Sequence, residues 1–129
     1  MTDKSSDKTD TLMVYRDDDG IVVFDYGTQI IDLKGALISN EMHRKLNPKG
    51  PEPILIIGES ATGVRSDLVA YAASKEVVDV TAASAILATS AVAQVLANLY
   101  MKFHDTPYPT RVFTDEKAAR KWLLEVTGE

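Results

Sequence analysis

The sequence predicts an α/β fold built on a mixed sheet, and three observations support this prediction. An Asp-Gly turn at 17–20 separates two β-rich runs, which is a strong hairpin signal. Short continuous apolar runs at 53–58 and 85–89 are typical of strands covered on both faces. Helical spacing of apolar residues between and after these runs favours later strands that are parallel and joined by right-handed crossovers.

The composition favours one domain and a cytoplasmic location. A chain of 129 residues with 45% hydrophobic content can bury one sizeable core, which we expect over residues 11–129. Residues 1–10 carry no large apolar side chain after Met1 and are expected to form a disordered tail. Cysteine is absent and no apolar secretion segment follows the polar start, so disulfides and thiolate chemistry are excluded and a cytoplasmic protein is predicted.

Charge and hydropathy also disfavour two classes of partner. The net charge of −5 opposes binding to nucleic acid, which depends on Lys and Arg to neutralise phosphates. The longest apolar stretch, at 82–99, is interrupted by polar residues and falls short of the roughly 20 apolar residues that span a bilayer. The chain is therefore expected neither to bind nucleic acid nor to span a membrane.

The first elements follow directly from these signals. Residues 11–16 and 21–26 are expected to form an antiparallel hairpin around the turn. Asp32 can cap a helix that continues to about 46, with Leu33, Ala36 and Leu37 among its apolar positions, and the segment 47–51 ends it.

The middle of the chain is expected to supply the central strands. Residues 53–58 are the best candidate, and 85–89 resemble a second central strand. A helix is expected to start near Ser66, and a turn or short helix near Val77 and Val78. Ser90 can cap the most periodic helix of the chain, whose apolar positions are Val92, Val95, Leu96, Leu99 and Phe103.

The C-terminal segment is expected to form an edge strand and a final helix. Residues 110–113 read as the strand, Thr114 as the helix cap, and Asp115 and Glu116 as favourable charges at the positive end of the helix dipole. Trp122 is expected to be a buried anchor. It belongs to an inward stripe that comprises Ala118, Ala119, Trp122, Leu123 and Val126.

The closing pattern at 113–123, Phe-Thr-Asp-Glu-Lys-Ala followed by Trp-Leu, together with Tyr108-Pro109-Thr110 before it and the order of elements, resembles the SpoIIAA-like branch of the STAS superfamily. The resemblance covers about residues 11–126. It implies a sheet of four or five strands with helices mainly on one face. It also implies kinship with anti-sigma factor antagonists and, more distantly, with the CRAL-TRIO lipid-binding fold.

The resemblance further implies a candidate site in the loop at 58–63. In the antagonists, a serine in an Asp-Ser motif is phosphorylated by a partner kinase, which switches binding; here Glu59 replaces the Asp before Ser60. A phosphate of about −1.5 to −2 charges beside Glu59 would repel a docked partner. The phospho-acceptor or interaction loop comprises Glu59, Ser60, Thr62, Arg65 and Ser66, although Ser60 and Ser66 also suit loop hydrogen bonds and helix capping.

Two other hypotheses compete with an interaction module. The first is binding of a small apolar, lipid-like ligand by Val92, Leu96, Tyr100 and Phe103, which would otherwise pack in the core. The second is acyl transfer by Ser60, for which the nucleophile-elbow spacing fails and a base at His43 or His104 must lie within hydrogen-bond reach.

No metal site is predicted either. His43 has no second ligand one turn away and is expected on a solvated helical face, and the acidic turn at 17–20 lacks the EF-hand spacing. The sequence therefore favours a non-enzymatic regulatory or protein-interaction module without cofactor or metal, which binds a protein partner or associates as a homodimer.

Overall fold

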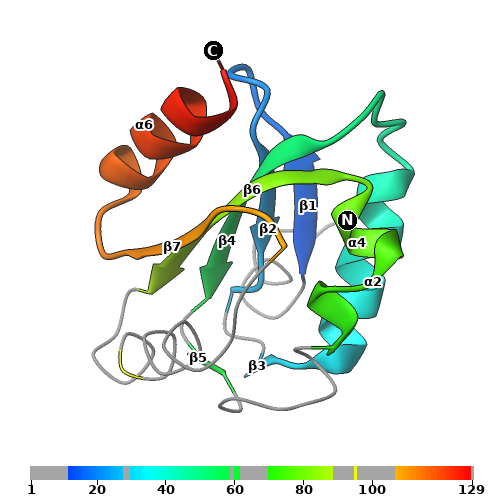
Figure 1. The fold of residues 1–129 in the computed structure, drawn as a ribbon. Coiled ribbons are helices and arrows are strands. Elements are labelled where there is room, and N and C mark those ends of the chain that lie inside the picture. Colours follow the sequence, from blue (N-terminus) through cyan, green and yellow to red (C-terminus); the bar gives the residue numbers. More distant parts are fainter. Residues whose placement is uncertain are drawn as a thin grey trace, which may run out of the picture.

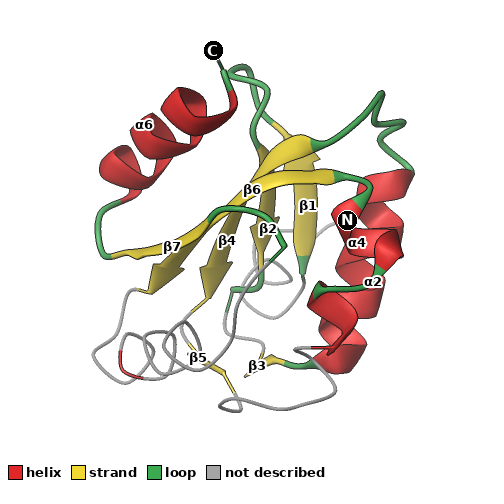
Figure 2. Cartoon of the chain, viewed as in Figure 1, coloured by secondary structure: helices red, strands yellow, loops and turns green. Residues whose placement is uncertain are grey.

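The computed structural model describes residues 12–27, 30–58, 60–61, 70–88, 95 and 107–128. Within these ranges a five-stranded sheet has the strand order β1-β2-β4-β6-β7 (Figures 1 and 2). β1 and β2 are antiparallel, and every later neighbour is parallel. The predicted mixed sheet is confirmed. Its strands are β1 Met13–Arg16, β2 Val22–Asp25, β4 Glu52–Gly58, β6 Thr81–Ala88 and β7 Thr110–Phe113.

The opening hairpin is held by its aspartate turn. The Asp17 carboxylate accepts hydrogen bonds from the backbone N–H groups of Asp19 and Ile21, at 2.9 and 3.1 Å. Gly20 adopts φ +83°, a backbone conformation that is unfavourable for residues other than glycine. These bonds confirm the predicted hairpin and set the register that pairs Val14 with Phe24.

The central strands agree with the apolar runs, with one change of boundary. β4 lies between β2 and β6, as the continuous run at 53–58 predicts. β6 begins at Thr81 rather than near Ala85, because the small, buried residues Thr81, Ala83 and Ser84 already pair with the start of β4. Among the described strands, β7 pairs only with β6 and is the predicted edge strand.

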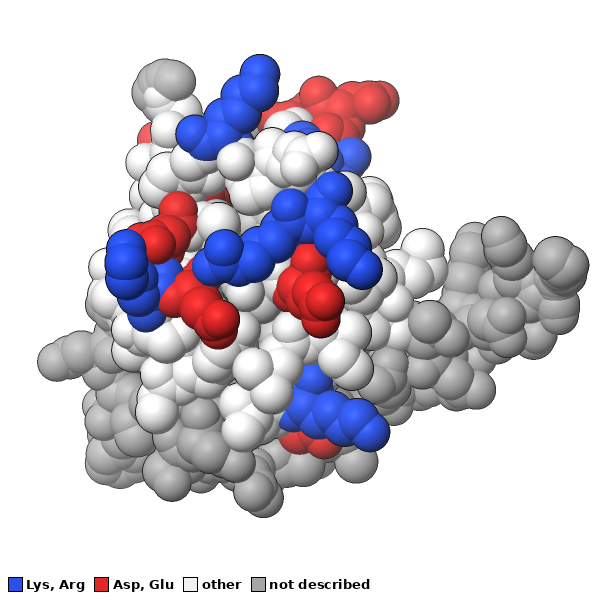
Figure 3. Space-filling view, turned by 90° about the vertical axis from the view of Figure 1, so that its right-hand side faces the viewer, with Lys and Arg blue, Asp and Glu red and all other residues white. Residues whose placement is uncertain are grey.

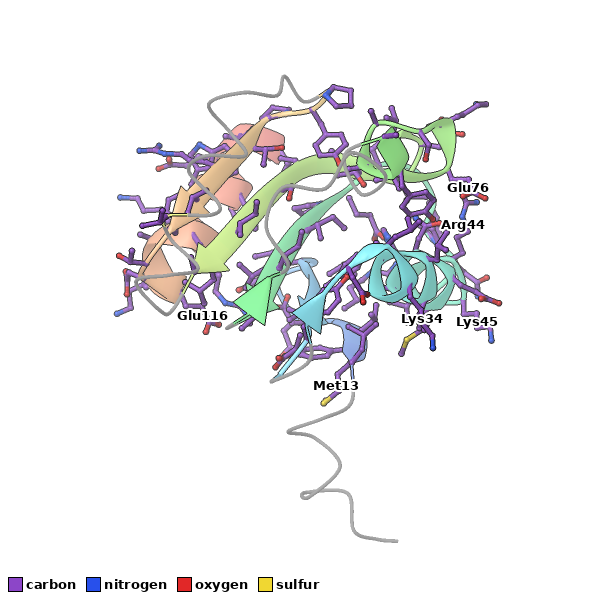
Figure 4. The ribbon with its side chains drawn as sticks, turned by 90° about the horizontal axis from the view of Figure 1, so that it is seen from below. Met13, Lys34, Arg44, Lys45, Glu76 and Glu116 are labelled. Atoms are coloured by element: carbon purple, nitrogen blue, oxygen red, sulfur yellow. The ribbon has the colours of Figure 1, made fainter. Side chains whose placement is uncertain are left out.

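The described helices cover both faces of the sheet. α2 (Leu33–Arg44) and α4 (Lys75–Val78) share one face, whereas α6 (Glu116–Thr127) packs on β4, β6 and β7 from the opposite face (Figures 1 and 4). The Asp32 carboxylate caps α2 by accepting from Gly35 N–H at 2.9 Å, which confirms the predicted helix start. α4 confirms the short helix expected at 77–78.

The hydrophobic core lies between α6 and the sheet. Trp122 and Phe113 pack against it as partly buried side chains, with ring centroids 5.6 Å apart. The buried cluster contains Ile21, Val23, Leu55, Ala83, Ala85, Leu87, Ala119 and Leu123. The buried cluster between α6 and the sheet therefore consists of aliphatic side chains.

The details of α6 differ from the sequence-based prediction in three respects. The cap is Asp115, whose carboxylate accepts from Ala118 N–H at 3.0 Å, and not Thr114, because Asp115 is the last residue with extended backbone. Of the predicted inward stripe, Ala119 and Leu123 are buried, but Val126 is 41% exposed and Ala118 is also exposed. Trp122 lies at the rim of the core and is not fully buried.

A second, two-stranded parallel sheet was not expected from the sequence. It joins β3 (Ile30–Ile31) to β5 (Ser60–Ala61), with Ile30 opposite Ser60. The predicted tail at 1–10 lies outside the described residues. So does most of the helix expected near Ser66, of which residues 70–72 are described and helical, and most of the helix that follows Ser90, of which Val95 is described, helical and exposed.

Candidate functional site

Helix α2 buries polar residues and exposes apolar ones. Its buried positions are Gly35, Ser39, Asn40 and His43. Leu37 and Ile38 are 46% and 42% exposed, so Leu37, one of the apolar positions at helical spacing, does not belong to the buried core. We call Lys34, Leu37, Ile38 and Glu41 the α2 outer face, since all four side chains are exposed.

The sheet-facing side of α2 can be polar because its buried side chains find hydrogen-bond partners. Ser39 Oγ donates to Ala36 O at 3.0 Å, so the Tyr26 hydroxyl must donate to Ser39 Oγ in their 3.1 Å contact. Gly35 admits the aromatic ring, because a Cβ at this position would stand 3.0 Å from Tyr26 Cε2. Burial raises the pKa of Tyr26, which keeps this hydroxyl protonated as a donor.

His43 forms one end of a hydrogen-bonded triad that comprises Arg16, Glu52 and His43. Its Nε2 lies 2.8 Å from Glu52 Oε1, and Arg16 binds the same carboxylate through Nε at 2.8 Å and Nη2 at 3.0 Å. The His43 side chain is only 1% exposed and meets the Phe24 ring edge-on, with centroids 5.8 Å apart. The prediction of a solvated His43 is therefore wrong, because a strand carboxylate pairs with the ring beneath the helix.

The triad fixes the charge on Glu52. Burial by itself would raise the pKa of this carboxyl, but the hydrogen bonds from Arg16 and His43 outweigh it, and the pKa is lowered. The bond to Glu52 also raises the pKa of Arg16. His43 Nδ1 is buried and has no hydrogen-bond partner in the described part of the chain, so Glu52 is the polar partner on which this ring depends.

The outer edge of α2 is tied to α4. Arg44 Nη2 donates to Glu76 O at 2.7 Å, and Arg44 Nε donates to Asn40 Oδ1 at 3.0 Å. Figure 4 shows Arg44 beside Glu76, with Lys34 and Lys45 on the outward side of α2. Burial, followed by the nearby Glu76 charge, raises the pKa of Tyr71 to about 12. Arg44 is thus a structural contact between the helices.

A second ionic cluster joins the opening hairpin to α6. Arg120 Nη1 contacts the Asp17 carboxylate, and Arg120 Nε binds Glu116 Oε2 at 2.9 Å. Burial alone would raise the pKa of Asp17, but Arg120 and the backbone amides of Ile21 and Asp19 outweigh it and lower the pKa. This cluster therefore links the turn of the opening hairpin to the C-terminal helix α6.

These carboxylates predict loss of stability in acid. Because the folded pKa values of Glu52 and Asp17 lie below their unfolded values, their contribution is complete above the unfolded carboxyl pKa of about 4. We expect the free energy of unfolding to fall as the pH drops through the folded values. Urea unfolding at a series of pH values measures this, and the variant Asp17→Asn should show a shallower acid decline. An unchanged decline in that variant would contradict the assignment of Asp17.

Within the described residues, the candidate groups for catalysis or metal binding do not come together. His43, offered as the base for acyl transfer, is inaccessible and paired with Glu52, while His104 lies outside the described ranges. Within those ranges no three His, Asp or Glu side chains gather in a way that could hold a metal ion. None of the helices described here has the length and apolar composition needed to cross a bilayer.

The structure leaves most of the predicted site residues untested. The backbone of Ser60 forms β5, which pairs with β3 directly before α2. The remaining loop residues, Glu59, Thr62, Arg65 and Ser66, and the apolar-ligand residues, Val92, Leu96, Tyr100 and Phe103, lie outside the described residues. The α2 outer face was not predicted from the sequence, although the spacing of its residues, i, i+3, i+4 and i+7, marks one helical face.

Figure 3 shows the side of the molecule that carries α2 and α4. Lys and Arg side chains alternate there with Asp and Glu around uncoloured surface, and neither sign of charge prevails. White surface, which belongs to residues of other kinds, lies between these charges.

Comparison with solved structures supports the fold. The chain is similar to an uncharacterized protein from the DUF3478 family with a SpoIIAA-like fold from Shewanella loihica PV-4, with a TM-score of 0.54, 18% identity and coverage of 88% of this chain and 92% of that one. A protein of unknown function from Arthrobacter sp. FB24 is 24% identical over 85% of this chain and 90% of that one, and its TM-score of 0.28 is too low to indicate a shared fold.

The first of these structures supports the predicted SpoIIAA-like fold and, at its level of identity, shows the fold alone. The CRAL-TRIO relation finds no mention in either description and stays a prediction. No curated protein matches this sequence. A family model matches residues 15–127, from β1 to the last residue of α6, and the chain therefore belongs to the family described as Domain of unknown function (DUF7793).

Proposed function

We propose that this chain is a non-enzymatic, cytoplasmic regulatory module that binds a protein partner through the α2 outer face. One observation carries the proposal: Leu37 and Ile38 are exposed on a helix that buries polar residues against the sheet. An amphipathic helix of a monomer normally turns its apolar side to the core. The reversed pattern of α2 supports an apolar contact outside this chain.

These two side chains are not part of the buried core. The sheet-facing side of α2 is already occupied by Tyr26, Glu52 and their hydrogen bonds to Ser39 and His43. Single exposed hydrophobic residues are common and require no explanation. Two adjacent ones between Lys34 and Glu41 form instead a small apolar centre with a charged rim, which is the anatomy of a protein interface.

The regulatory part of the proposal concerns Ser60. Because β5 pairs with β3, the backbone of Ser60 lies opposite Ile30, and Asp32, the cap of α2, follows β3 directly. A phosphate on Ser60 would add about −1.5 to −2 charges next to the strand that leads into the helix. A charge at this position can change the presentation of the α2 outer face without touching it.

The experiment that tests the proposal compares two exposed positions. A photo-crosslinking residue at Leu37 should capture a protein in cells, whereas the same residue at Leu124, which is 40% exposed on α6, should not. The captured protein is then identified, purified and titrated against the chain. We expect Ile38→Lys to weaken that complex at least tenfold and to change the free energy of unfolding by less than about 1 kcal/mol.

Three outcomes would overturn the proposal. The first is no capture at Leu37 beyond that at Leu124. The second is a purified complex that Ile38→Lys leaves unchanged. The third is a loss of stability in Ile38→Lys as large as that of a core truncation, because this would show that the side chain serves the fold.

A further inference from the structure

We propose that the partner of the α2 outer face is a second copy of this chain, held by an antiparallel contact between the two α2 helices across a two-fold axis. The inference rests on the proposed function, since it uses the same face, and it adds the identity and orientation of the partner. Its support is the order of the four residues that make up the face.

The four residues form a single stripe along the helix. Lys34, Leu37, Ile38 and Glu41 are separated by three, one and three positions, which places them on one side of an α-helix. All four are exposed, and the residues that alternate with them are buried or partly buried, from Gly35 and Ala36 to Ser39 and Asn40. A second helix can therefore lie along the stripe without displacing any core side chain.

The stripe is complementary to itself in one orientation. A two-fold axis midway between residues 37 and 38 places Leu37 opposite Ile38 of the second copy and Lys34 opposite Glu41 of the second copy. Both contacts occur twice, as a two-fold interface requires. A parallel arrangement would instead bring Lys34 against Lys34 and Glu41 against Glu41, and like charges at a close contact are unfavourable.

The charges of the stripe are available for such a contact. Within the described residues, neither Lys34 nor Glu41 forms an ion pair with the rest of the chain. The neighbouring cation differs, because Arg44 is already bound to the Glu76 backbone and to Asn40. The apolar centre and the two charges at its ends therefore match the same face of a second copy.

Charge-reversal variants of the full chain test both the partner and the orientation. Sedimentation velocity from about 10 to about 1000 μM should show a reversible dimer of the wild type, with micromolar affinity because one helix pair is a small interface. Ile38→Lys should weaken the dimer at least tenfold. Leu124→Lys, at an equally exposed position on α6, is the matched control and should leave it intact.

The orientation follows from the charged pair. Lys34→Glu and Glu41→Lys should each weaken self-association, because each creates two repulsive contacts per dimer. An equimolar mixture of these two variants should form the heterodimer, and the double variant Lys34→Glu/Glu41→Lys should recover self-association. Circular dichroism before each run checks that every variant is folded.

Each contrary outcome has a defined meaning. A wild-type monomer over the whole concentration range overturns the inference, as does a dimer that Leu124→Lys disrupts and Ile38→Lys does not. Failure of the mixed variants to associate overturns the antiparallel orientation. A wild-type monomer whose Leu37 position nevertheless binds a different purified protein leaves the proposed function standing and removes this inference alone.

Discussion

Leu123→Ala is expected to lower the free energy of unfolding by about 3 to 5 kcal/mol. Leu123 is fully buried on α6 and belongs to the cluster between that helix and the sheet. The strand residues of β6 in the same cluster include Ala83 and Ala85, whose side chains are too short to fill the space left by the leucine. The substitution therefore creates a cavity that relaxes little, and its cost lies in the upper part of the range for such changes.

Urea unfolding followed by circular dichroism measures this effect. Leu124→Ala is the matched control, because Leu124 is the next residue of α6 and is 40% exposed. We expect that control to cost less than about 1 kcal/mol. Equal losses from the two variants would mean that α6 does not bury Leu123 against the sheet as described.

Glu52→Ala is expected to cost about 2 to 3 kcal/mol, the second largest effect. Glu52 is the shared acceptor of Arg16 and His43, and its removal leaves the buried His43 ring with no polar partner at either nitrogen among the described residues. The cost lies below that of a fully buried ion pair because the Arg16 and Glu52 side chains are 32% and 17% exposed.

The order of effects within the triad makes this prediction specific. Arg16→Ala should cost less than Glu52→Ala, since it leaves the bond between His43 and Glu52 in place and removes a partly exposed cation. Chemical denaturation of both variants at pH 7 gives the comparison. A larger loss from Arg16→Ala than from Glu52→Ala would show that the buried ring does not depend on the carboxylate.

The sequence predicts those parts of the fold that have a local cause. The Asp17 carboxylate and Gly20 encode the hairpin within a few residues, and the apolar run of β4 signals burial on both faces without reference to any distant residue. The Asp32 cap is also local, because its carboxylate binds Gly35 N–H only three residues along the chain. One displaced cap, Asp115 in place of Thr114, reflects two capping residue types side by side.

The inner side of α2 depends on residues that no local pattern connects. Glu52 lies 36 residues from Arg16, and Tyr26 lies 13 residues from Ser39. These partners allow polar side chains to be buried on the inner side of α2. The helical spacing of Leu33, Ala36 and Leu37 suggests an apolar inner side instead, but Leu37 is exposed. This difference makes the α2 outer face visible only in the structure, because hydrophobic spacing by itself does not say which side of a helix meets the sheet.

The contact between Asp17 and Arg120 joins residues that are 103 positions apart. A ribosome that makes this protein has to release the residues up to those of α6 before this helix can cover β4 and β6. During synthesis, the aliphatic side chains on that face of the sheet stay uncovered long after the hairpin has left the exit tunnel, a state that favours aggregation. The completion of α6 therefore ends the exposure of this face of the sheet during synthesis.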